Sequence, residues 1–388
     1  MTRMKKIYCA FLSLWIVLIC LTSCDPKHTC VAEGTEREKE TAATCVAEGH
    51  YDLVARCSVC RNELSRTTET VEKQKAHIYE NGKCRTCGAT ETIPDPKGYL
   101  RCKQNGDADP NGAYVLFGEY PQTVKADNVT VTDVQDFRGY YLGSDGYFYA
   151  AVKAEPFLGG YTFTTGTNIE KSSVYYFKVE PIRWRIYLEN EHGASILCDS
   201  IIDSKAYQSS YKFDSEAGVY YATVSDAPAE TFQNNYAYSE VRAWLNAQFY
   251  EIAFSDLQRS AIIATTVSNG VSTTGYPTNP YVCENTEDFV FLPAHLVVTK
   301  SAYGFSAVAY NRDEARQMQT SDYARANGAY MQTNEADYGM GSWWLRSPYY
   351  EYSNHVREVR SGGDASYRNS ARAEAENGVV PALKLRLQ

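Results

Sequence analysis

Two apolar runs, Ile182-Arg183-Trp184-Arg185-Ile186-Tyr187-Leu188 and Ala194-Ser195-Ile196-Leu197-Cys198, flank the turn sequence Asn190-Glu191-His192-Gly193. Aromatic and β-branched residues on both sides of a turn that contains Asn and Gly predict an antiparallel β-hairpin. Further short strands are expected at Ala113–Phe117, Tyr175–Val179, Phe289–Leu292, Trp343–Leu345, His355–Val359 and Val379–Leu387. Residues 113–388 are therefore expected to form a mostly antiparallel sheet domain.

Few helices are expected in this domain. The clearest one opens at Ser239-Glu240 and carries apolar residues at i, i+3, i+4 and i+8 on one face. Ser255-Asp256 is expected to cap a second helix over Leu257–Ile262, and a third is expected near Asn311–Met318. Long turn-rich stretches remain between these elements. The fold class is thus predicted to be α+β, with few helices and long loops.

The composition limits the class of protein. The chain has 388 residues, 44% of them hydrophobic, which is enough for two or three domains and excludes disorder and collagen-like structure. A net charge of −9 argues against nucleic-acid binding, because phosphate contacts need clustered Lys and Arg. The 32 tyrosines fit an exported, loop-rich binding domain. Ten of the 12 cysteines lie before residue 103, so the cysteines belong mainly to the N-terminal part of the chain.

The first 24 residues have the organisation of a lipoprotein signal. Three basic residues precede the apolar run Ile7–Leu21, which is shorter than the roughly 20 residues that span a membrane. Leu21-Thr22-Ser23-Cys24 resembles the lipobox of bacterial lipoproteins. This resemblance implies a signal peptide over residues 1–23, lipidation (palmitate) at Cys24, and tethering to the extracytoplasmic side of a membrane, at the cell surface or the periplasmic face. An ordinary secretory signal, with Cys24 unmodified, is the alternative.

Residues 24–92 contain few large apolar side chains and are expected to depend on their cysteines for stability. The knuckles Cys57-x-x-Cys60 and Cys84-x-x-Cys87 have 23 residues between them, slightly more than is usual in a zinc ribbon. Cys57, Cys60, Cys84 and Cys87 are therefore candidate ligands of a structural zinc ion, with Cys45 and His77 as further candidates. Disulfides are the alternative, because thiols oxidise outside the cytoplasm. Four protein ligands would leave the metal no open position for catalysis.

The Cys-rich region also contains an internal repeat. Thr29-Cys30-Val31-Ala32-Glu33-Gly34 recurs as Thr44-Cys45-Val46-Ala47-Glu48-Gly49. With its knuckles, the region resembles Cys-x-x-Cys modules that are repeated in bacterial surface proteins, which implies short β-hairpins. A linker over residues 93–112 is expected to separate this module from the large domain at 113–388.

Several motifs of the large domain occur in a characteristic order. They are Phe117–Gln122, Glu180–Trp184, Ser239–Asn246, Asp288–Leu292, Trp343–Pro348 and Gly378–Leu383. In this order they resemble a bacterial surface domain classified as domain of unknown function 6273. The last two motifs are also similar to the closing sheet of the C-type-lectin-like fold, shared with formylglycine-generating enzymes. The cysteine pair that holds copper in those enzymes has no counterpart in the closing segment, so the resemblance implies a fold and not that activity.

The candidate binding residues of this domain are Arg242, Asn246, Trp343, Trp344 and Arg346. They could instead be architectural, with Trp rings in the core and Arg side chains paired with carboxylates or carbonyls. Tyr349, Tyr350 and Tyr352 follow in an expected loop and are candidates for stacking against a sugar or peptide. No catalytic residue is predicted, because His192, His295 and His355 lack a recognisable nucleophile partner. Cys198 and Cys283 could pair or remain thiols.

The sequence as a whole predicts a membrane-anchored lipoprotein with a binding or adhesion role. Its expected partners are the membrane, through the lipid anchor, and a glycan or surface-protein ligand, with no nucleic acid. Structural zinc is the cofactor expected. The alternatives are an enzyme that acts on an envelope or surface substrate, and a structural envelope protein.

Overall fold

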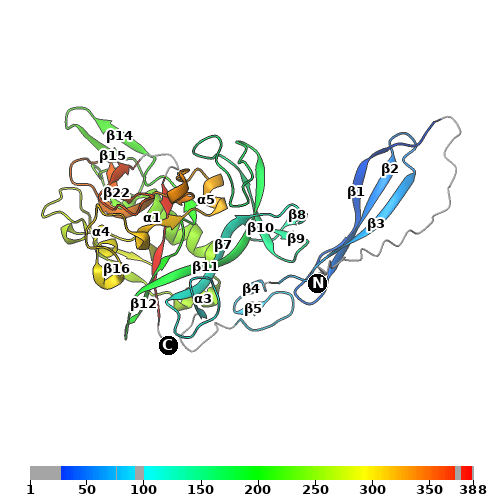
Figure 1. The fold of residues 1–388 in the computed structure, drawn as a ribbon, viewed down its shortest axis with the longest axis horizontal. Coiled ribbons are helices and arrows are strands. Elements are labelled where there is room, and N and C mark those ends of the chain that lie inside the picture. The colour runs from blue at the N-terminus through cyan, green and yellow to red at the C-terminus, as the bar shows by residue number, and fades with distance from the viewer. Residues whose placement is uncertain (1–27, 76, 92–99, 372–376, 387–388) are drawn as a thin grey trace, which may run out of the picture. The chain divides into compact units, whose positions relative to one another are not determined.

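The computed structural model describes residues 28–75, 77–91, 100–371 and 377–386 (Figure 1). They fall into two compact units, one formed by residues 28–42 and 49–70 and the other by 43–48 and the described residues from 71 onward. The expected signal peptide, the lipidation site Cys24 and the first part of the expected linker, residues 93–99, lie outside the described residues. Within the described ranges, no helix combines the length and the apolar character needed to cross a membrane.

The first unit is a three-stranded sheet in the order β1 (Ala32–Thr41), β2 (Gly49–Cys57) and β3 (Glu63–Val71). β1 pairs antiparallel with β2. Arg66 on β3 donates to Asp52 on β2 at 2.7 Å and to Glu38 on β1 at 2.9 Å. These ion pairs across all three strands supplement the few buried apolar side chains of this small sheet.

The second unit is built on a nine-stranded sheet that contains the expected hairpin. β11 (Val174–Asn190) turns into β12 (Gly193–Cys198), with Asn190 opposite Gly193. The sheet order is β18-β25-β12-β11-β10-β9-β8, and β7 joins β6 to β11. The remaining strands are β6 (Leu100–Cys102), β7 (Tyr114–Val124), β8 (Val131–Gln135), β9 (Tyr141–Gly143), β10 (Phe148–Lys153), β18 (Val290–Phe291) and β25 (Ala382–Leu385).

Strand β11 is longer than the sequence predicts. Glu180-Pro181 was expected to separate two strands, whereas one strand of 17 residues runs through it. Proline has no N–H to donate, and the pairing with β7 slips in register between Lys178 and Val179 and again between Pro181 and Arg183. These irregularities let the strand continue past the proline.

A five-stranded sheet forms the C-terminal part of the same unit. Its order is β13 (Asp203–Ser204), β24 (Gly378–Val379), β21 (Trp343–Pro348), β22 (His355–Val359) and β23 (Arg368–Ser370). Four small hairpins or strand pairs surround the sheets: β4 (Tyr79–Glu80) with β5 (Lys83–Cys84), β14 (Tyr211–Asp214) with β15 (Val219–Ala222), β16 (Thr265–Val267) with β17 (Thr286–Asp288), and β19 (Met318–Gln319) with β20 (Met340–Gly341).

The α-helices are short. They are α1 (Glu240–Trp244), α2 (Tyr250–Ala253), α3 (Asp256–Ala261), α4 (His295–Val298) and α5 (Asp322–Ala326). A π-helical turn at Leu245–Phe249 joins α1 to α2. The helix that the sequence predicts to begin at Ser239-Glu240 is therefore continuous from Glu240 to Ala253. Ser255 and Gln258 form a capping box at α3, where the second helix was expected. The third is reduced to the 3-10 turn Glu314–Arg316, since the buried Arg316 bonds to surrounding loop carbonyls.

One hydrophobic core connects the two sheets with the α1–α2 segment. Trp184 of β11 and Trp343 and Trp344 of β21 are among its largest fully buried side chains. The indole N–H of Trp184 donates to the Phe117 carbonyl of the adjacent strand at 2.7 Å. The fold is α+β and rich in sheet with few helices, as the sequence predicts.

Candidate functional site

The first cluster of metal-ligand atoms lies in the first unit, at the end of β2. It contains His28, Cys30, Cys57 and Cys60, whose ligand atoms all lie within 4.8 Å of one another. His28 Nε2 is 3.4 Å from Cys57 Sγ and 3.7 Å from Cys30 Sγ, and Cys30 Sγ is 3.9 Å from Cys60 Sγ. The knuckle turn therefore brings its two sulfurs against the segment that precedes β1.

The second cluster lies in the other unit, at the β4–β5 hairpin. It contains Cys45, His77, Cys84 and Cys87, again with all ligand atoms within 4.8 Å. Cys45 Sγ is 3.7 Å from Cys84 Sγ, and Cys87 Sγ is 3.3 Å from His77 Nδ1. Gly88 follows the knuckle with φ +71°, a left-handed conformation that glycine adopts without strain, and its N–H closes the turn onto the Cys84 carbonyl.

Both clusters have the dimensions of a tetrahedral zinc site. With Zn–S near 2.3 Å and Zn–N near 2.0–2.1 Å, the edges of the tetrahedron are about 3.8 Å between sulfurs and about 3.5 Å between sulfur and nitrogen. The sulfur–sulfur distances of 3.7 and 3.9 Å and the sulfur–nitrogen distances of 3.3–3.7 Å are close to these values. A disulfide needs about 2.05 Å. The two clusters could each hold a metal ion.

The knuckle geometry also favours the thiolate form that binds metal. Hydrogen bonds from the backbone N–H groups of Cys60 and Val59 lower the pKa of the Cys57 thiol to about 5. Burial alone would raise the pKa of Cys84, but hydrogen bonds from the backbone N–H groups of Cys87 and Thr86, together with the His77 and Cys87 side chains, outweigh burial and lower it to about 6. Burial, together with the neighbouring sulfurs, raises the pKa of Cys45 to about 11. A cation at the centre would offset the repulsion between these sulfurs.

The structure groups the predicted ligands differently from one ribbon-type site. The two knuckles lie in separate clusters and do not share a metal position, and Cys45 and His77 complete the second cluster. Sequence reasoning missed His28 and Cys30. The signal that could have found Cys30 is the hexapeptide repeat, because each copy supplies one thiol, Cys30 to the first cluster and Cys45 to the second.

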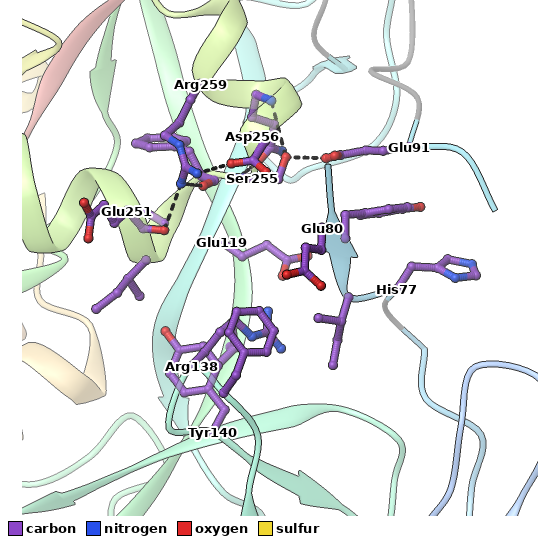
Figure 2. Close-up of a pocket in the computed structure, with 18 of the residues that line it drawn as sticks. His77, Glu80, Glu91, Glu119, Arg138, Tyr140, Glu251, Ser255, Asp256 and Arg259 are labelled. Carbon is purple, nitrogen blue, oxygen red and sulfur yellow. Dashed lines mark hydrogen bonds and ion pairs between the residues drawn. The ribbon is translucent and has the colours of Figure 1, made fainter. Parts of the chain in front are cut away.

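A carboxylate-lined cavity of about 380 Å³ lies between the β4–β5 hairpin and the α2–α3 region (Figure 2). Its acidic side chains are Glu80, Glu91, Glu119, Glu251 and Asp256. Burial raises the pKa of Glu119 and that of Glu91. Tyr140 is 6% exposed, and its hydroxyl has no hydrogen-bond partner among the described residues. The cavity thus gathers five acidic groups, of which Glu119 and Glu91 are held in a poorly solvated environment.

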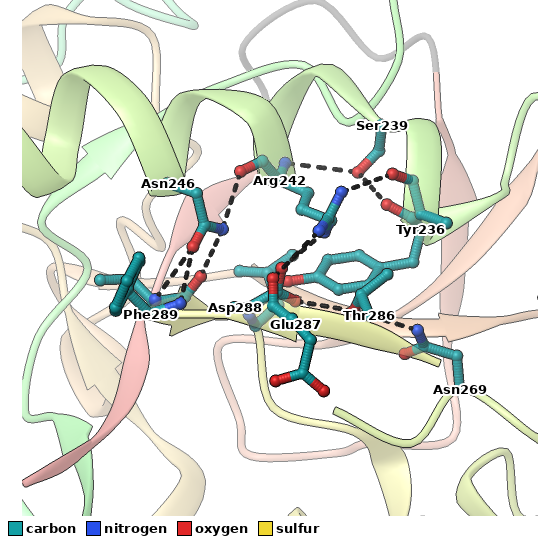
Figure 3. A network of polar contacts seen from close by, with 12 residues as sticks. Tyr236, Ser239, Arg242, Asn246, Asn269, Thr286, Glu287, Asp288 and Phe289 are labelled. Atoms are coloured by element: carbon teal, nitrogen blue, oxygen red, sulfur yellow. Dashed lines mark hydrogen bonds and ion pairs between the residues drawn. The ribbon is translucent and has the colours of Figure 1, made fainter. Parts of the chain in front are cut away.

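Arg242 and Asn246 form a network inside the large domain (Figure 3). Arg242 Nε donates to Asp288 Oδ1 at 2.6 Å, and a terminal nitrogen donates to the Ala237 carbonyl at 2.7 Å. Asn246 bonds both to the Val290 carbonyl, at 2.8 Å, and to the Phe289 N–H, at 2.8 Å. These contacts join the first helix to the segment that contains strands β17 and β18. Both side chains are engaged in scaffold contacts.

Trp343, Trp344 and Arg346 are also engaged in the interior. Both Trp side chains are fully buried, and their indole N–H groups donate to the carbonyls of Arg316 and Lys205 at 3.1 and 2.9 Å. Arg346 is 7% exposed and donates to the Leu292 carbonyl at 2.7 Å. The expectation of a ligand surface at the two tryptophans is therefore corrected, because neither ring reaches the surface.

A partly exposed cluster of aromatic and arginine side chains follows immediately after these residues. We call it the tyrosine–arginine surface, and it consists of Tyr276, Tyr349, Tyr350, Tyr352, Arg357 and Arg368. The ring centroids of Tyr276 and Tyr350 are 4.2 Å apart, and Tyr349 is stacked on Tyr352 at 6.2 Å. Tyr350 and Tyr352 are 37% and 46% exposed and Arg368 is exposed, whereas Tyr349 and Arg357 are buried. The structure thus brings the three tyrosines named from the sequence into one cluster, to which a separate loop adds Tyr276.

The β14–β15 hairpin extends the aromatic character of this region. Its Phe213 is 54% exposed and lies 4.6 Å from the Tyr220 ring. The Tyr220 N–H donates to Ser353 Oγ at 2.8 Å, which fixes the hairpin beside the turn that carries Tyr352. Sequence reasoning placed this hairpin in a turn-rich stretch and did not predict its contribution.

The histidines and cysteines of the large domain that the sequence analysis considered occupy ordinary interior or surface positions. His295 begins α4, is 7% exposed, and burial lowers its pKa to about 3, so it is neutral near pH 7. Cys198 and Cys283 are not joined in a disulfide, and burial raises the pKa of Cys198 to about 12. An un-ionised buried thiol is a poor nucleophile. His192 is exposed in the β11–β12 turn.

Comparison with known proteins gives one result. Neither a search of curated proteins nor a search of solved structures found a match to this chain. Residues 209–387 match the model of a family described as "Domain of unknown function (DUF6273)".

Proposed function

We propose that this protein is a membrane-anchored extracytoplasmic lipoprotein whose large domain binds a glycan or protein ligand through the tyrosine–arginine surface. The observation that carries the proposal is the cluster of four tyrosine rings with two guanidinium groups over them, at the end of the β21–β22 and β22–β23 strand pairs. Partly exposed Tyr rings offer apolar area and a polar hydroxyl at little entropic cost, which suits recognition of sugars and peptides. A C-type-lectin-like fold for the domain is part of the same proposal.

Structural zinc in both cysteine clusters completes the proposed architecture. Each cluster offers three Cys and one His, a ligand set used by structural zinc sites, and leaves no position for a substrate. The ion would fix the segment before β1 to the β2 knuckle in one unit and the β4–β5 hairpin to the Cys45 loop in the other. Such sites stabilise regions that have little core of their own.

An array of glycans and extracellular matrix proteins, probed with the purified full chain, tests the binding function. We expect specific binding that the double substitution Tyr350→Ala and Tyr352→Ala weakens at least tenfold. Tyr310→Ala is the matched control, because Tyr310 is 73% exposed and lies outside the surface. Silence on both arrays, or binding that the double variant retains, would contradict the proposal.

An enzyme is the second candidate function, and the cavity of Figure 2 favours it. Glu119 and Glu91 both line this cavity with pKa values raised by burial, as is common for a general acid. Incubating the protein with the ligands that it binds on the arrays would reveal turnover. Turnover lost in Glu119→Gln, with binding retained, would establish the enzyme and place its chemistry in the cavity.

A further inference from the structure

Two arginines of the tyrosine–arginine surface form an unusual pair. Arg357 on β22 lies directly opposite Arg368 on β23 in the antiparallel register. Like charges at such a position repel each other. Within the described part of the chain neither guanidinium has a salt bridge to a carboxylate, and the titratable groups that face Arg357 are tyrosines and the buried His295. The sheet therefore holds two positive charges side by side without a counter-ion.

The burial of the Arg357 guanidinium is energetically unfavourable. Arg357 is 4% exposed, and its Nε has no hydrogen-bond partner among the described residues. The rest of the guanidinium bonds to neutral groups, which are the Ala365 carbonyl at 3.4 Å and the Tyr276 side chain. The guanidinium lies 4.3 Å from the centroid of the Tyr276 ring, a cation–π contact that offsets part of the cost of burial. Burying a cation without an opposite charge is otherwise strongly unfavourable. Its charge projects a positive potential onto the surface above it.

Arg368 is the exposed member of the pair. Its guanidinium lies 4.5 Å from the Tyr349 ring centroid and 5.6 Å from that of Tyr352. The nearby carboxylate of Glu351 accepts a hydrogen bond from the Tyr350 hydroxyl at 2.7 Å and pairs with neither arginine. In a chain with a net charge of −9, the two guanidinium groups leave this surface with one more positive charge than Glu351 offsets. This excess points to an anionic ligand group beside the aromatic rings.

We propose that the tyrosine–arginine surface binds an acidic glycan, whose carboxylate or sulfate is bound by Arg368 and whose sugar ring stacks on Tyr350 or Tyr352. This inference rests on the proposed binding function and names the class of its ligand. A guanidinium offers two parallel N–H donors that match a carboxylate or sulfate, and the adjacent ring faces suit the C–H face of a sugar. A glycan uses both features at once, because it carries the anion on the ring that stacks.

The test measures binding of the purified full chain to heparin, which carries sulfate and carboxylate, to hyaluronan, which carries carboxylate alone, and to neutral dextran. We expect binding to at least one acidic glycan and none to dextran, and the two acidic arms separate sulfate from carboxylate recognition. Arg368→Gln should weaken binding at least tenfold, and Arg368→Lys should weaken it less. Arg312→Gln is the control, because it also removes one exposed positive charge but lies outside the surface. It should leave the affinity within about twofold.

The outcomes separate this inference from the proposed function. If a neutral glycan or a protein binds through Tyr350 and Tyr352 and Arg368→Gln has no effect, the acidic-glycan inference is overturned and the binding function stands. If Arg312→Gln weakens heparin binding as much as Arg368→Gln, the attraction is non-specific and the inference is overturned. If nothing binds at this surface, both proposals fail. Circular dichroism of Arg368→Gln checks that its fold is intact.

Discussion

Replacing Arg242 with methionine tests whether this residue belongs to the scaffold or to a ligand surface. The substitution keeps a long apolar side chain and removes the counter-ion that the structure gives to Asp288 at 2.6 Å. The Asp288 side chain is fully buried, and burial raises its pKa while the Arg242 charge opposes that rise. Without Arg242, only the Thr286 hydroxyl, at 2.8 Å, still donates to this carboxylate among the described residues.

The expected loss follows from this geometry. Removing one partner of a buried ion pair costs about 3–5 kcal/mol, because the other charge stays buried without compensation. A quarter of the Arg242 side chain is exposed, so water screens part of the pair and we expect the lower end, about 3 kcal/mol. The loss should shrink as the pH falls from 7 to 5. In the variant the folded-state pKa of Asp288 lies above its unfolded value, and protonation removes the buried charge.

Urea denaturation followed by tryptophan fluorescence measures this loss. Arg312→Met is the control, since Arg312 is about half exposed in its pair with Asp337 and its removal should cost less than about 1 kcal/mol. The reasoning is refuted if Arg242→Met costs no more than Arg312→Met. It is also refuted if the variant keeps its stability and loses ligand binding, because Arg242 would then be a ligand residue.

Three further predictions concern the anchor, a buried histidine and the metal. Cys24→Ser should abolish incorporation of labelled palmitate and move the protein from the membrane fraction to the soluble fraction; an unchanged membrane fraction would contradict lipid anchoring. Between pH 7.5 and 4.5 the unfolded state gains a proton on His295, whose ordinary pKa is 6.5, while the native state, with a pKa of about 3, does not. His295 should therefore contribute a loss of about 2–3 kcal/mol in stability as the pH falls through this range. Urea denaturation at both pH values should show that His295→Leu loses about 2–3 kcal/mol less than the wild type, and an equal loss in the two proteins would contradict this role of the buried imidazole. Removing metal with a strong chelator should release the Cys57 and Cys84 thiols to a thiol reagent and lower the unfolding temperature in calorimetry, and an unchanged thiol count would exclude metal ligation.

The sheet and the main helices could be predicted because their signals are local. The hairpin at Asn190–Gly193 and the capping box at Ser255 need only turn chemistry and a cap, which a short window of sequence contains. The continuous β11 could not be predicted, because a proline normally ends a strand. Here the register shifts in the pairing with β7 accommodate Pro181 within the strand. The expected helix near residue 315 fails for a similar reason, since the buried Arg316 is satisfied by loop carbonyls.

The candidate sites depend on contacts between distant segments and were harder to predict. The knuckle spacing identified four of the cysteines. The grouping of each knuckle with its other ligands depends on tertiary structure, as in the first cluster, where the pairing of β1 with β2 brings Cys30 close to Cys60. The pairing of Arg357 with Arg368 depends on the β22–β23 register, which the sequence pattern does not specify. Tyr349, Tyr350 and Tyr352 were found because they follow a recognisable strand.

The zinc content of the purified chain, measured by mass spectrometry of the metal, tests most directly the claim that the cysteines form two separate metal centres. The claim predicts about two zinc ions per chain, and about one in each of the variants Cys57→Ser and Cys84→Ser, because each substitution breaks one four-ligand set. A single zinc ion that either substitution removes completely would show one shared ribbon-type site. A chain without zinc, whose cysteines are closed in disulfides, would likewise contradict the claim.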